Sequence, residues 1–409
     1  MPELLAPAGN PEKLRAVFRY GADAAYLAGK IFGMRSACDN FSREELLDAV
    51  ALAKSLGKKI YVTVNTLPRT YQYGELAEYI DFLAASGIDA VIVADIGVFS
   101  LIRERAPKLE IHISTQASVV SAASANAWHK LGAKRVVLAR ELTFDEIRDI
   151  RKNTPSTLEL EAFVHGSMCI SYSGRCLISN YLSSRDANRG ACSQPCRWNY
   201  HVRKFEIAEE KRENLPLPVE EYEDGTFIMS SRDMNMIAHV PELVEAGIDS
   251  FKIEGRVKSA YYGAVTTNAY RIAIDRYTED PDKYEFDPAL YAELESVSHR
   301  EFCTGFYFGA PTEGANTVTE NGYLREKAYL ATVLSYDDKT GRARFVQRNK
   351  LTSGDSVEMI SPGKIGRGFT VGVIYGEDGA EIPSAPHPGM IFEADVPFPV
   401  LPGDIMRGA

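Results

Sequence analysis

The sequence of 409 residues lacks the features that define several classes of protein. It contains no run of about 18 consecutive apolar residues, which argues against a membrane-spanning helix. Its first residues, Met1–Pro7, carry no basic leader, so we expect no signal peptide. Without an export signal, the six cysteines are expected in the reducing cytoplasm, where metal-binding and redox roles are more common than disulfides.

Common catalytic and cofactor motifs are also missing. The chain has no Gly-x-Ser-x-Gly nucleophile motif and no His-Glu-x-x-His zinc motif. None of the seven histidines is followed by a second one four positions later; they are His112, His129, His165, His201, His239, His299 and His387. No Gly-x-Gly-x-x-Gly follows the first predicted strand, which argues against a dinucleotide-binding fold. The standard serine and zinc peptidases are therefore without support in the sequence.

The charge of the chain is unevenly distributed. Lys and Arg number 46 while Asp and Glu number 56, so the net charge is −10. Residues 165–204 carry six basic residues and one acidic residue, a net charge of +5, which leaves −15 for the rest. Such a basic island on an acidic body can focus a polyanion at one place. A solvated Arg-rich loop fits the same charge equally well.

Residues 1–260 alternate between short apolar runs and longer amphipathic stretches. Eight runs are predicted as buried parallel strands: Glu3–Pro7, Ala24–Leu27, Lys59–Val64, Ala90–Ala94, Glu110–Ser114, Arg135–Ala139, Glu159–Val164 and Ser250–Ile253. Capping patterns at Asn10-Pro11, at Ser42 with Glu45 and at Thr143 with Glu146 predict the starts of three helices. This alternation predicts an α/β fold of the (β/α)8 TIM-barrel type, with a doubly wound open sheet as the alternative.

Two further segments depart from this repeat. Residues 166–229 separate the last two predicted strands without a simple crossover helix, and such a long insertion is typical of a functional region on the C-terminal face of a barrel. We therefore predict a barrel domain over residues 1–278 with this insertion, and a connecting segment over residues 279–326. From residue 327 to residue 409, short alternating strands between Gly, Pro and Asp turns predict a small antiparallel β-barrel domain.

Four cysteines of the insertion form the most informative pattern, Cys169-x6-Cys176-x15-Cys192-x3-Cys196. Four thiolates complete either a tetrahedral zinc site or a four-iron cluster. The spacing differs from the Cys-x-x-Cys pairs of a zinc ribbon, and a place on the active face favours a [4Fe-4S] cluster over zinc. Unligated thiols are the third interpretation. Outside the set, Cys303 is expected to be a packing residue, and Cys38 is either a substitute ligand or structural.

The residues around these cysteines resemble a known family. The run EAFVHGSMCISYSGRCLIS at residues 161–179 continues with RGACSQPCR at residues 189–197. Together with ELLAPAG at residues 3–9, SSRD at residues 230–233 and KIEGR at residues 252–256, it resembles the signature of the collagenase-like peptidase family, peptidase family U32. The resemblance covers nearly the whole chain, and within the family it is strongest to the tRNA 5-hydroxyuridine hydroxylation proteins.

The resemblance implies an iron–sulfur-dependent enzyme that hydroxylates the wobble uridine of tRNA to 5-hydroxyuridine without oxygen and with prephenate as cosubstrate. It assigns the cluster ligands to Cys169, Cys176, Cys192 and Cys196, although some relatives take a ligand from a more distant cysteine in place of the one at Cys196. tRNA is the expected partner, and a paralogous second subunit is left open. The family name keeps a peptidase as an alternative, and a non-catalytic zinc-containing RNA-binding protein is a further one.

Polar residues at the ends of the predicted strands complete the candidate site, because barrel geometry brings strand ends to one mouth. Catalytic roles are predicted for His165, Glu254 and Arg140. Substrate-binding roles are predicted for Arg175, Arg189, Arg197, Lys252, Arg256, Gln116 and Asn65, and Glu141 belongs to the same strand-end set. Arg140, Lys252 or Arg256 would clamp the carboxylates of prephenate, whereas Tyr172, Tyr181 and Trp198 would stack on an unstacked base. Internal ion pairs, such as Lys252 with Glu254, and ordinary packing are the alternatives.

Overall fold

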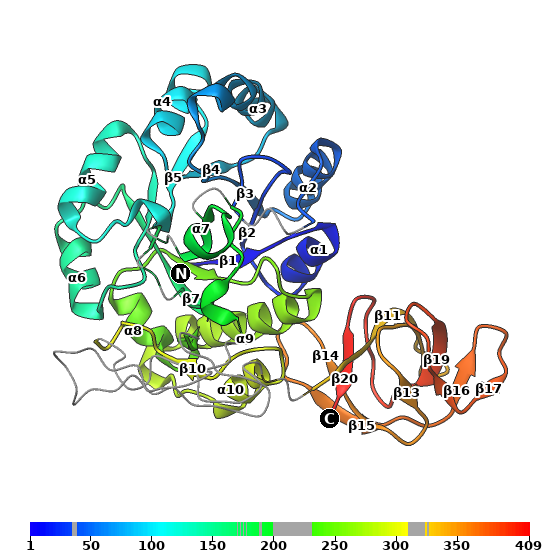
Figure 1. The fold of residues 1–409 in the computed structure, drawn as a ribbon. Coiled ribbons are helices and arrows are strands. Elements are labelled where there is room, and N and C mark those ends of the chain that lie inside the picture. The colour runs from blue at the N-terminus through cyan, green and yellow to red at the C-terminus, as the bar shows by residue number, and fades with distance from the viewer. Residues whose placement is uncertain are drawn as a thin grey trace, which may run out of the picture.

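The computed structural model describes residues 1–34, 39–169, 171, 173–174, 176, 178–187, 190–198, 231–309, 324 and 327–409. The side chains of Asn180, Tyr181, Leu182 and Arg197 lie outside this description. Figure 1 shows two bodies, a ring of strands surrounded by helices and a smaller all-strand body that ends at the C-terminus.

Eight parallel strands form a closed barrel, as the sequence predicts. They are β1 (Glu3–Pro7), β2 (Ala24–Leu27), β3 (Lys59–Val64), β4 (Ala90–Val93), β5 (Glu110–Ile113), β6 (Arg135–Val137), β7 (Glu159–Ser167) and β9 (Ser250–Ile253). Strands β1 to β7 pair in chain order, and β9 closes the ring by pairing with both β7 and β1. Closure excludes the alternative of a doubly wound open sheet. Outside the ring, β8 (Asp233–Asn235) pairs with the end of β7, and β10 (Phe302–Cys303) pairs with β8.

Helices cover the outside of the barrel (Figure 1). They are α1 (Pro11–Arg19), α2 (Arg43–Ser55), α3 (Tyr73–Ser86), α4 (Ile96–Arg105), α5 (Ala122–Leu131), α6 (Phe144–Lys152), α8 (Val240–Glu245), α9 (Ala260–Glu279) and α10 (Pro288–Glu295), whereas α7 (Ile178–Ser183) belongs to the insertion. The three predicted caps are confirmed, because Asn10 accepts the Lys13 N–H and the other two patterns form reciprocal capping boxes. In the described part of the chain, no helix has the length and hydropathy needed to span a membrane.

Strand alternation separates two sets of barrel side chains. The outward set, which includes Val62, Val91 and Leu160, packs against the helices in the main hydrophobic core. The inward set contains a small apolar cluster of Leu5, Ala24, Tyr26, Tyr61, Ala90 and Ile92 together with several charged residues. The lumen is therefore partly polar, whereas branched apolar residues usually fill the interior of such barrels.

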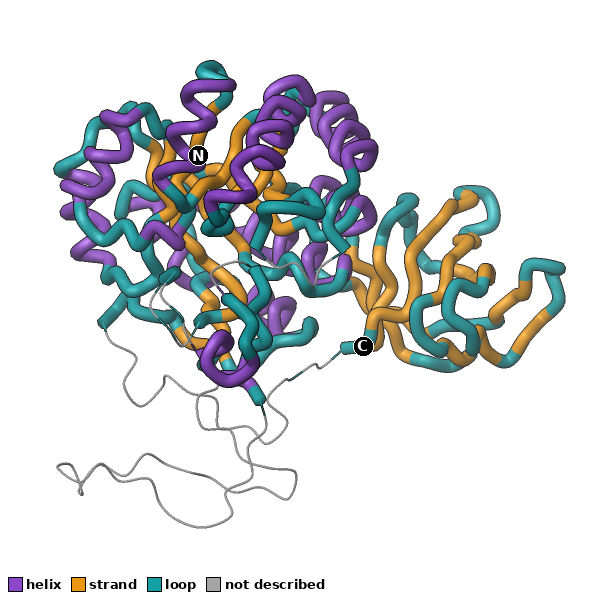
Figure 2. The backbone as a smooth tube through the Cα atoms, turned by 45° about the horizontal axis from the view of Figure 1, so that its top comes forward, coloured by secondary structure: helices purple, strands orange, loops and turns teal. Residues whose placement is uncertain are grey.

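The C-terminal body is a curled antiparallel sheet (Figure 2), which confirms the predicted β domain. Its strands are β11 (Tyr329–Asp337), β12 (Arg342–Gln347), β13 (Leu351–Thr352), β14 (Ser356–Ile360), β15 (Arg367–Thr370), β16 (Ile374–Gly376), β17 (Glu381–Ile382), β18 (Ser384–Ala385), β19 (Ile391–Asp395) and β20 (Ile405–Gly408). Eight of them pair in the order β15-β14-β20-β11-β12-β19-β16-β17, and β13 pairs with β18. Its own core includes the stacked rings of Phe345 and Phe392, 5.1 Å apart.

A buried arginine joins this sheet to the barrel helices. Arg407 on β20 is 2% exposed, and its Nη2 lies 2.6 Å from Glu293 Oε1 on α10 and 2.7 Å from Glu358 Oε2 on β14. Its Nη1 donates to Ser296 Oγ at 2.8 Å. Because these groups are desolvated and paired with one another, the contact fixes the position of the β domain against α10.

Candidate functional site

The C-terminal ends of the barrel strands bring several predicted residues to one mouth. Asn65 follows β3, and its amide nitrogen donates to Ser114 Oγ after β5 at 3.4 Å. The N–H of Gln116 donates to the same hydroxyl oxygen, also at 3.4 Å. Arg256 follows β9, and its Nη1 donates to Thr63 Oγ1 in β3 at 3.1 Å. Asn65, Gln116 and Arg256 thus lie at the same end of the barrel.

Arg140 reaches this mouth from the end of β6. Its guanidinium carbon lies 3.8 Å from the centre of the Phe163 ring, and its Nη1 donates to the Ser167 carbonyl at 2.7 Å. Phe163 faces the lumen, because it pairs in register with Lys252. The aromatic face and the backbone bond together hold the guanidinium in one orientation at the mouth.

Lys252 is bound inside the lumen. Its Nζ lies 2.6 Å from Glu161 Oε1, and both side chains are buried. Arg135 Nη1 lies 2.9 Å from the other oxygen of Glu161 and 2.6 Å from Glu3 Oε1. Burial alone would raise the pKa of Glu161, but Lys252 and Arg135 together lower this pKa to about 2. Lys252 therefore forms an internal ion pair, with Glu161 as its partner in place of the Glu254 considered from the sequence.

His165 does not face the mouth, which corrects the position expected for it from the sequence. A β-bulge interrupts the pairing of β7 with β9 immediately before His165, so that this residue lies opposite Ile253, a core residue that faces outward. The imidazole packs against the rings of Tyr262 and Tyr270 on α9 and of Phe302 on β10, with ring centres 6.0, 5.6 and 5.5 Å away. The extra residue of the bulge is the physical reason for the difference.

Burial also sets the protonation state of this histidine. His165 is 1% exposed, and neither ring nitrogen has a hydrogen-bond partner among the described residues. Burial lowers the pKa of His165 to about 3, although the Asp233 carboxylate acts in the opposite direction. The ring is therefore neutral near pH 7, so His165 does not supply an imidazolium as a general acid there.

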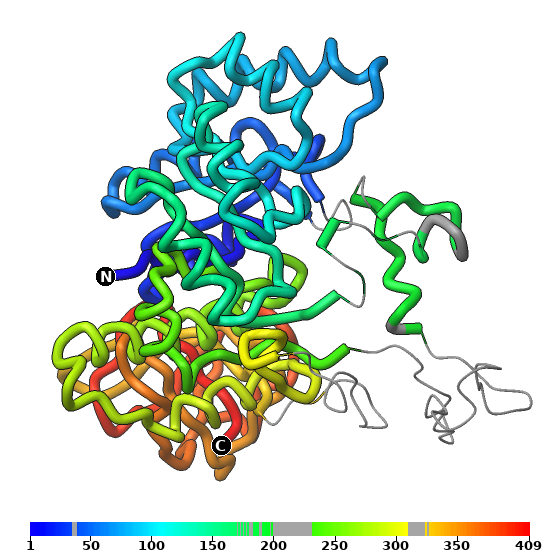
Figure 3. The backbone as a smooth tube through the Cα atoms, turned by 90° about the vertical axis from the view of Figure 1, so that its left-hand side faces the viewer, coloured from blue at the N-terminus to red at the C-terminus, as the bar shows by residue number. Residues whose placement is uncertain are grey.

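The described part of the insertion covers this end of the barrel. Figure 1 draws α7 over the centre of the ring of strands, and the view in Figure 3 places the same segment at one end of the barrel. None of the four cysteines of the predicted tetrad forms a disulfide in the described part of the chain: Cys169 is exposed, and Cys176, Cys192 and Cys196 are partly exposed. The N–H of Gln194 donates to Cys192 Sγ at 3.4 Å.

Glu141 connects this insertion to the mouth. Its Oε1 accepts the N–H of Ser173 at 2.8 Å, and Ser173 lies between Cys169 and Cys176 in the sequence. Sequence reasoning placed Glu141 among the strand-end residues but gave it no role. The contact joins positions 32 residues apart. The only sequence signal for it was the place of Glu141, beside Arg140, directly after a predicted strand.

The chemistry of the four cysteines fits a metal ion or a cluster, but the described residues do not form a complete set of ligands. Four thiols in one segment are the ligands that iron–sulfur clusters and zinc both use. In the part of the chain that the structure describes, no group of three or more His, Cys, Asp or Glu side chains is arranged to hold a metal ion.

Several predicted residues fall outside the described residues, namely Cys38, Tyr172, Arg175 and Arg189, as do the side chains of Tyr181 and Arg197. Trp198 is described: the residue is 39% exposed, and its Nε1–H donates to the Ser193 carbonyl at 2.9 Å. Cys303 lies in β10, where burial raises the pKa of its thiol, in keeping with a packing role.

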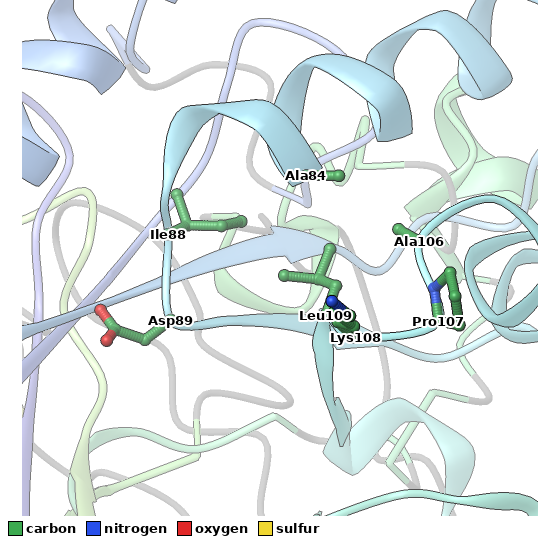
Figure 4. Close-up of a pocket in the computed structure, with 7 residues that line it drawn as sticks. All are labelled: Ala84, Ile88, Asp89, Ala106, Pro107, Lys108 and Leu109. Carbon is green, nitrogen blue, oxygen red and sulfur yellow. The ribbon is translucent and has the colours of Figure 1, made fainter.

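A surface pocket of ≈ 420 Å³ lies at the other end of the barrel (Figure 4). It is lined by Ala84, Ile88, Asp89, Ala106, Pro107, Lys108 and Leu109, which precede β4 and β5. None of the predicted site residues lines it, and enzymes with this fold place their active sites at the C-terminal ends of the strands. The mouth with its cysteine segment is therefore the candidate site.

Comparison with known proteins gives consistent matches along the chain. A family model described as "Peptidase family U32" matches residues 9–317, and one described as "Peptidase family U32 C-terminal domain" matches residues 325–407. "tRNA hydroxylation protein P1" of Bacillus subtilis is 38% identical over 406 residues, covering 99% of this chain and 94% of that protein. "tRNA hydroxylation protein P" of Escherichia coli is 35% identical over 432 residues, covering 97% and 94%. "Collagenase" of Porphyromonas gingivalis is 30% identical over 371 residues, covering 88% and 86%.

Proposed function

The chain belongs to peptidase family U32, and from this premise we propose that it is a cytoplasmic enzyme that modifies tRNA. The observation that carries the proposal is the identity of 38% and 35%, over nearly the full length, to two proteins named for tRNA hydroxylation. The geometry of the mouth supports it, because polar and basic side chains from several strands meet there beneath a segment with four cysteines outside disulfides.

We propose that the reaction is the oxygen-independent hydroxylation of the wobble uridine to 5-hydroxyuridine, with prephenate as cosubstrate. Arg140 and Arg256 would bind the carboxylates of prephenate, for which planar guanidinium groups are well suited. Contacts with Phe163 and Thr63 respectively orient these two side chains within the protein, which lowers the cost of ordering them on binding. Lys252 would support these two arginines from inside the lumen, where it is the buried ion-pair partner of Glu161.

The remaining mouth residues suit an unstacked nucleotide. Glu254, the buried carboxylate that directly follows β9, is assigned to proton transfer, whereas Glu141 accepts the N–H of Ser173. The amide groups of Asn65 and Gln116 would hydrogen-bond to the edge of the base, and the exposed ring of Trp198 would stack on it. The basic residues Arg175, Arg189 and Arg197 would contact phosphates.

A [4Fe-4S] cluster held by Cys169, Cys176, Cys192 and Cys196 is part of the same proposal, and zinc is the alternative occupant. When bound, such a cluster would supply one-electron transfer at the mouth. Iron and acid-labile sulfide, measured in chain purified without oxygen, are expected at about four of each per polypeptide. Stoichiometric zinc without sulfide would contradict this part of the proposal.

The activity is tested by mass spectrometry of tRNA nucleosides. Deleting the gene in a strain without a redundant paralogue should remove 5-hydroxyuridine and its derivatives from bulk tRNA, and a plasmid copy should restore them. An unchanged level in the deletion strain would contradict the proposed function.

Peptide hydrolysis is the second candidate, favoured by the 30% identity to a protein named collagenase. A serine or cysteine peptidase activates its nucleophile with an adjacent base. Among the described residues, however, no histidine is hydrogen-bonded to a serine hydroxyl or a cysteine thiol. Peptide cleavage that survives replacement of all four insertion cysteines would favour the peptidase over the tRNA enzyme.

A further inference from the structure

The turn between Cys169 and Cys176 is attached to the barrel mouth by a carboxylate. Glu141 Oε1 accepts the N–H of Ser173 at 2.8 Å, and the Ser173 hydroxyl donates to both oxygens of Glu141 at 3.1 Å. Ser173 is 9% exposed, so these bonds are largely shielded from water. Charge-assisted bonds of this kind are about twice as strong as bonds between neutral groups.

The loop after β5 holds the same turn from a second side. The hydroxyl of Ser118 donates to the Ser173 carbonyl. Gly174 adopts a left-handed conformation with φ of 73°, and a Cβ atom there would overlap the backbone of Gln116. Only glycine permits this close approach without displacing the turn.

The start of the segment is also fixed. Arg140 donates to the Ser167 carbonyl at 2.7 Å, and Ser231 Oγ donates to the Met168 carbonyl at 2.9 Å. Cys169 therefore follows one anchored point directly, and the Ser173–Gly174 turn provides a second anchored point before Cys176. The two thiols flank the turn but belong to no metal-ligating group among the described residues.

We propose that Glu141 is a positioning residue whose carboxylate fixes the Ser173–Gly174 turn at the mouth, so that Cys169 and Cys176 converge on a thiophilic metal centre from defined positions. The metal centre is the part that rests on the proposed function. Removing the carboxylate leaves the number of thiol ligands unchanged but loosens the turn, which the Ser118 hydroxyl still holds from the other side, so metal affinity falls.

Hydrogen exchange tests the anchor in the full-length chain. Glu141→Ala should speed exchange of the Ser173 amide by about tenfold or more, because the acceptor of that N–H is gone. Glu141→Gln keeps an acceptor oxygen and should restore most of the protection. The matched control is Asp145→Ala, which removes an exposed carboxylate from the following helix and should leave this amide unchanged. Equal exchange in wild type and Glu141→Ala would overturn the anchor.

Cobalt binding tests the positioning role. Co²⁺ added to the reduced, metal-free chain should give thiolate-to-metal charge-transfer absorption of equal final intensity in wild type and Glu141→Ala. The apparent affinity should be about tenfold weaker in Glu141→Ala and nearly normal in Glu141→Gln. Equal affinities, or a wild-type chain without this absorption, would overturn the role. Neither readout uses tRNA, so a failure here is distinct from a failure of the nucleoside measurement.

Discussion

At the scale of single residues, Glu161 shows how a polar lumen is stabilised. It is fully buried between Lys252 and Arg135, so its loss would leave two buried cations without their shared partner. Glu161→Gln is expected to lower the free energy of unfolding at pH 7 by about 3 kcal/mol, measured by urea denaturation. Glu104→Gln, an exposed change on α4, is the control and should alter it little. Equal stabilities for the two variants would contradict this role.

His165 gives the fold a dependence on mildly acidic pH. Because its folded-state pKa is about 3, below the usual 6.5, the unfolded chain takes up the proton first, and stability falls as pH falls from about 6.5 toward 3. Between pH 7 and pH 5, the wild type should lose about 2 kcal/mol more unfolding free energy than His165→Phe. Phenylalanine at position 165 can pack against the surrounding aromatic rings. The control is His387→Phe, a change at an exposed position, which should keep the pH profile of the wild type. Parallel pH profiles for wild type and His165→Phe would be incompatible with a neutral buried imidazole.

At the scale of elements, the bulge in β7 decides which side chains reach the mouth. Tyr270 on α9 supports it, because its hydroxyl donates to the Val164 carbonyl at 2.7 Å and accepts the Met236 N–H at 3.0 Å. Tyr270→Phe removes both of these bonds, while the Met236 N–H still donates to the Val164 carbonyl at 3.0 Å, so it should cost about 1 kcal/mol of unfolding free energy in thermal or urea unfolding. Tyr277→Phe, on the same helix nearer its end, should cost much less, and equal losses would argue against a supporting role for the Tyr270 hydroxyl.

The sequence predicts the elements themselves better than their local irregularities. Apolar runs such as Val91–Val93 and caps such as Ser42 with Glu45 act locally, so periodicity and capping rules locate the strands and helices. Alternation along β7 would turn His165 toward the same side as Glu161, but the bulge reverses it, and no sequence signal marks that extra residue. The bond between Glu141 and Ser173 joins a barrel loop to an insertion, so it becomes visible only when the chain is folded.

At the scale of the whole molecule, Arg407 couples the β domain to the barrel. It is paired with Glu293 on one body and Glu358 on the other. Arg407→Met should lower stability by about 3 kcal/mol and split a shared thermal transition into two in calorimetry, since both carboxylates lose their buried partner. Arg344→Met, which removes an exposed pair with Glu377, should leave the transition nearly unchanged. A single unshifted transition in Arg407→Met would show that the domains are coupled by other contacts.

The central claim about the whole molecule is that the proposed activity depends on the cysteine segment at the barrel mouth. The most direct measurement is the content of 5-hydroxyuridine derivatives, by mass spectrometry, in tRNA from a deletion strain that carries single-cysteine variants. Cys303→Ser, which changes a packing residue of β10, should restore the modified nucleosides to the wild-type level. Cys169→Ser should leave them absent although the chain is folded and present at normal abundance. Full restoration by Cys169→Ser would contradict the assignment of tRNA hydroxylation to this segment.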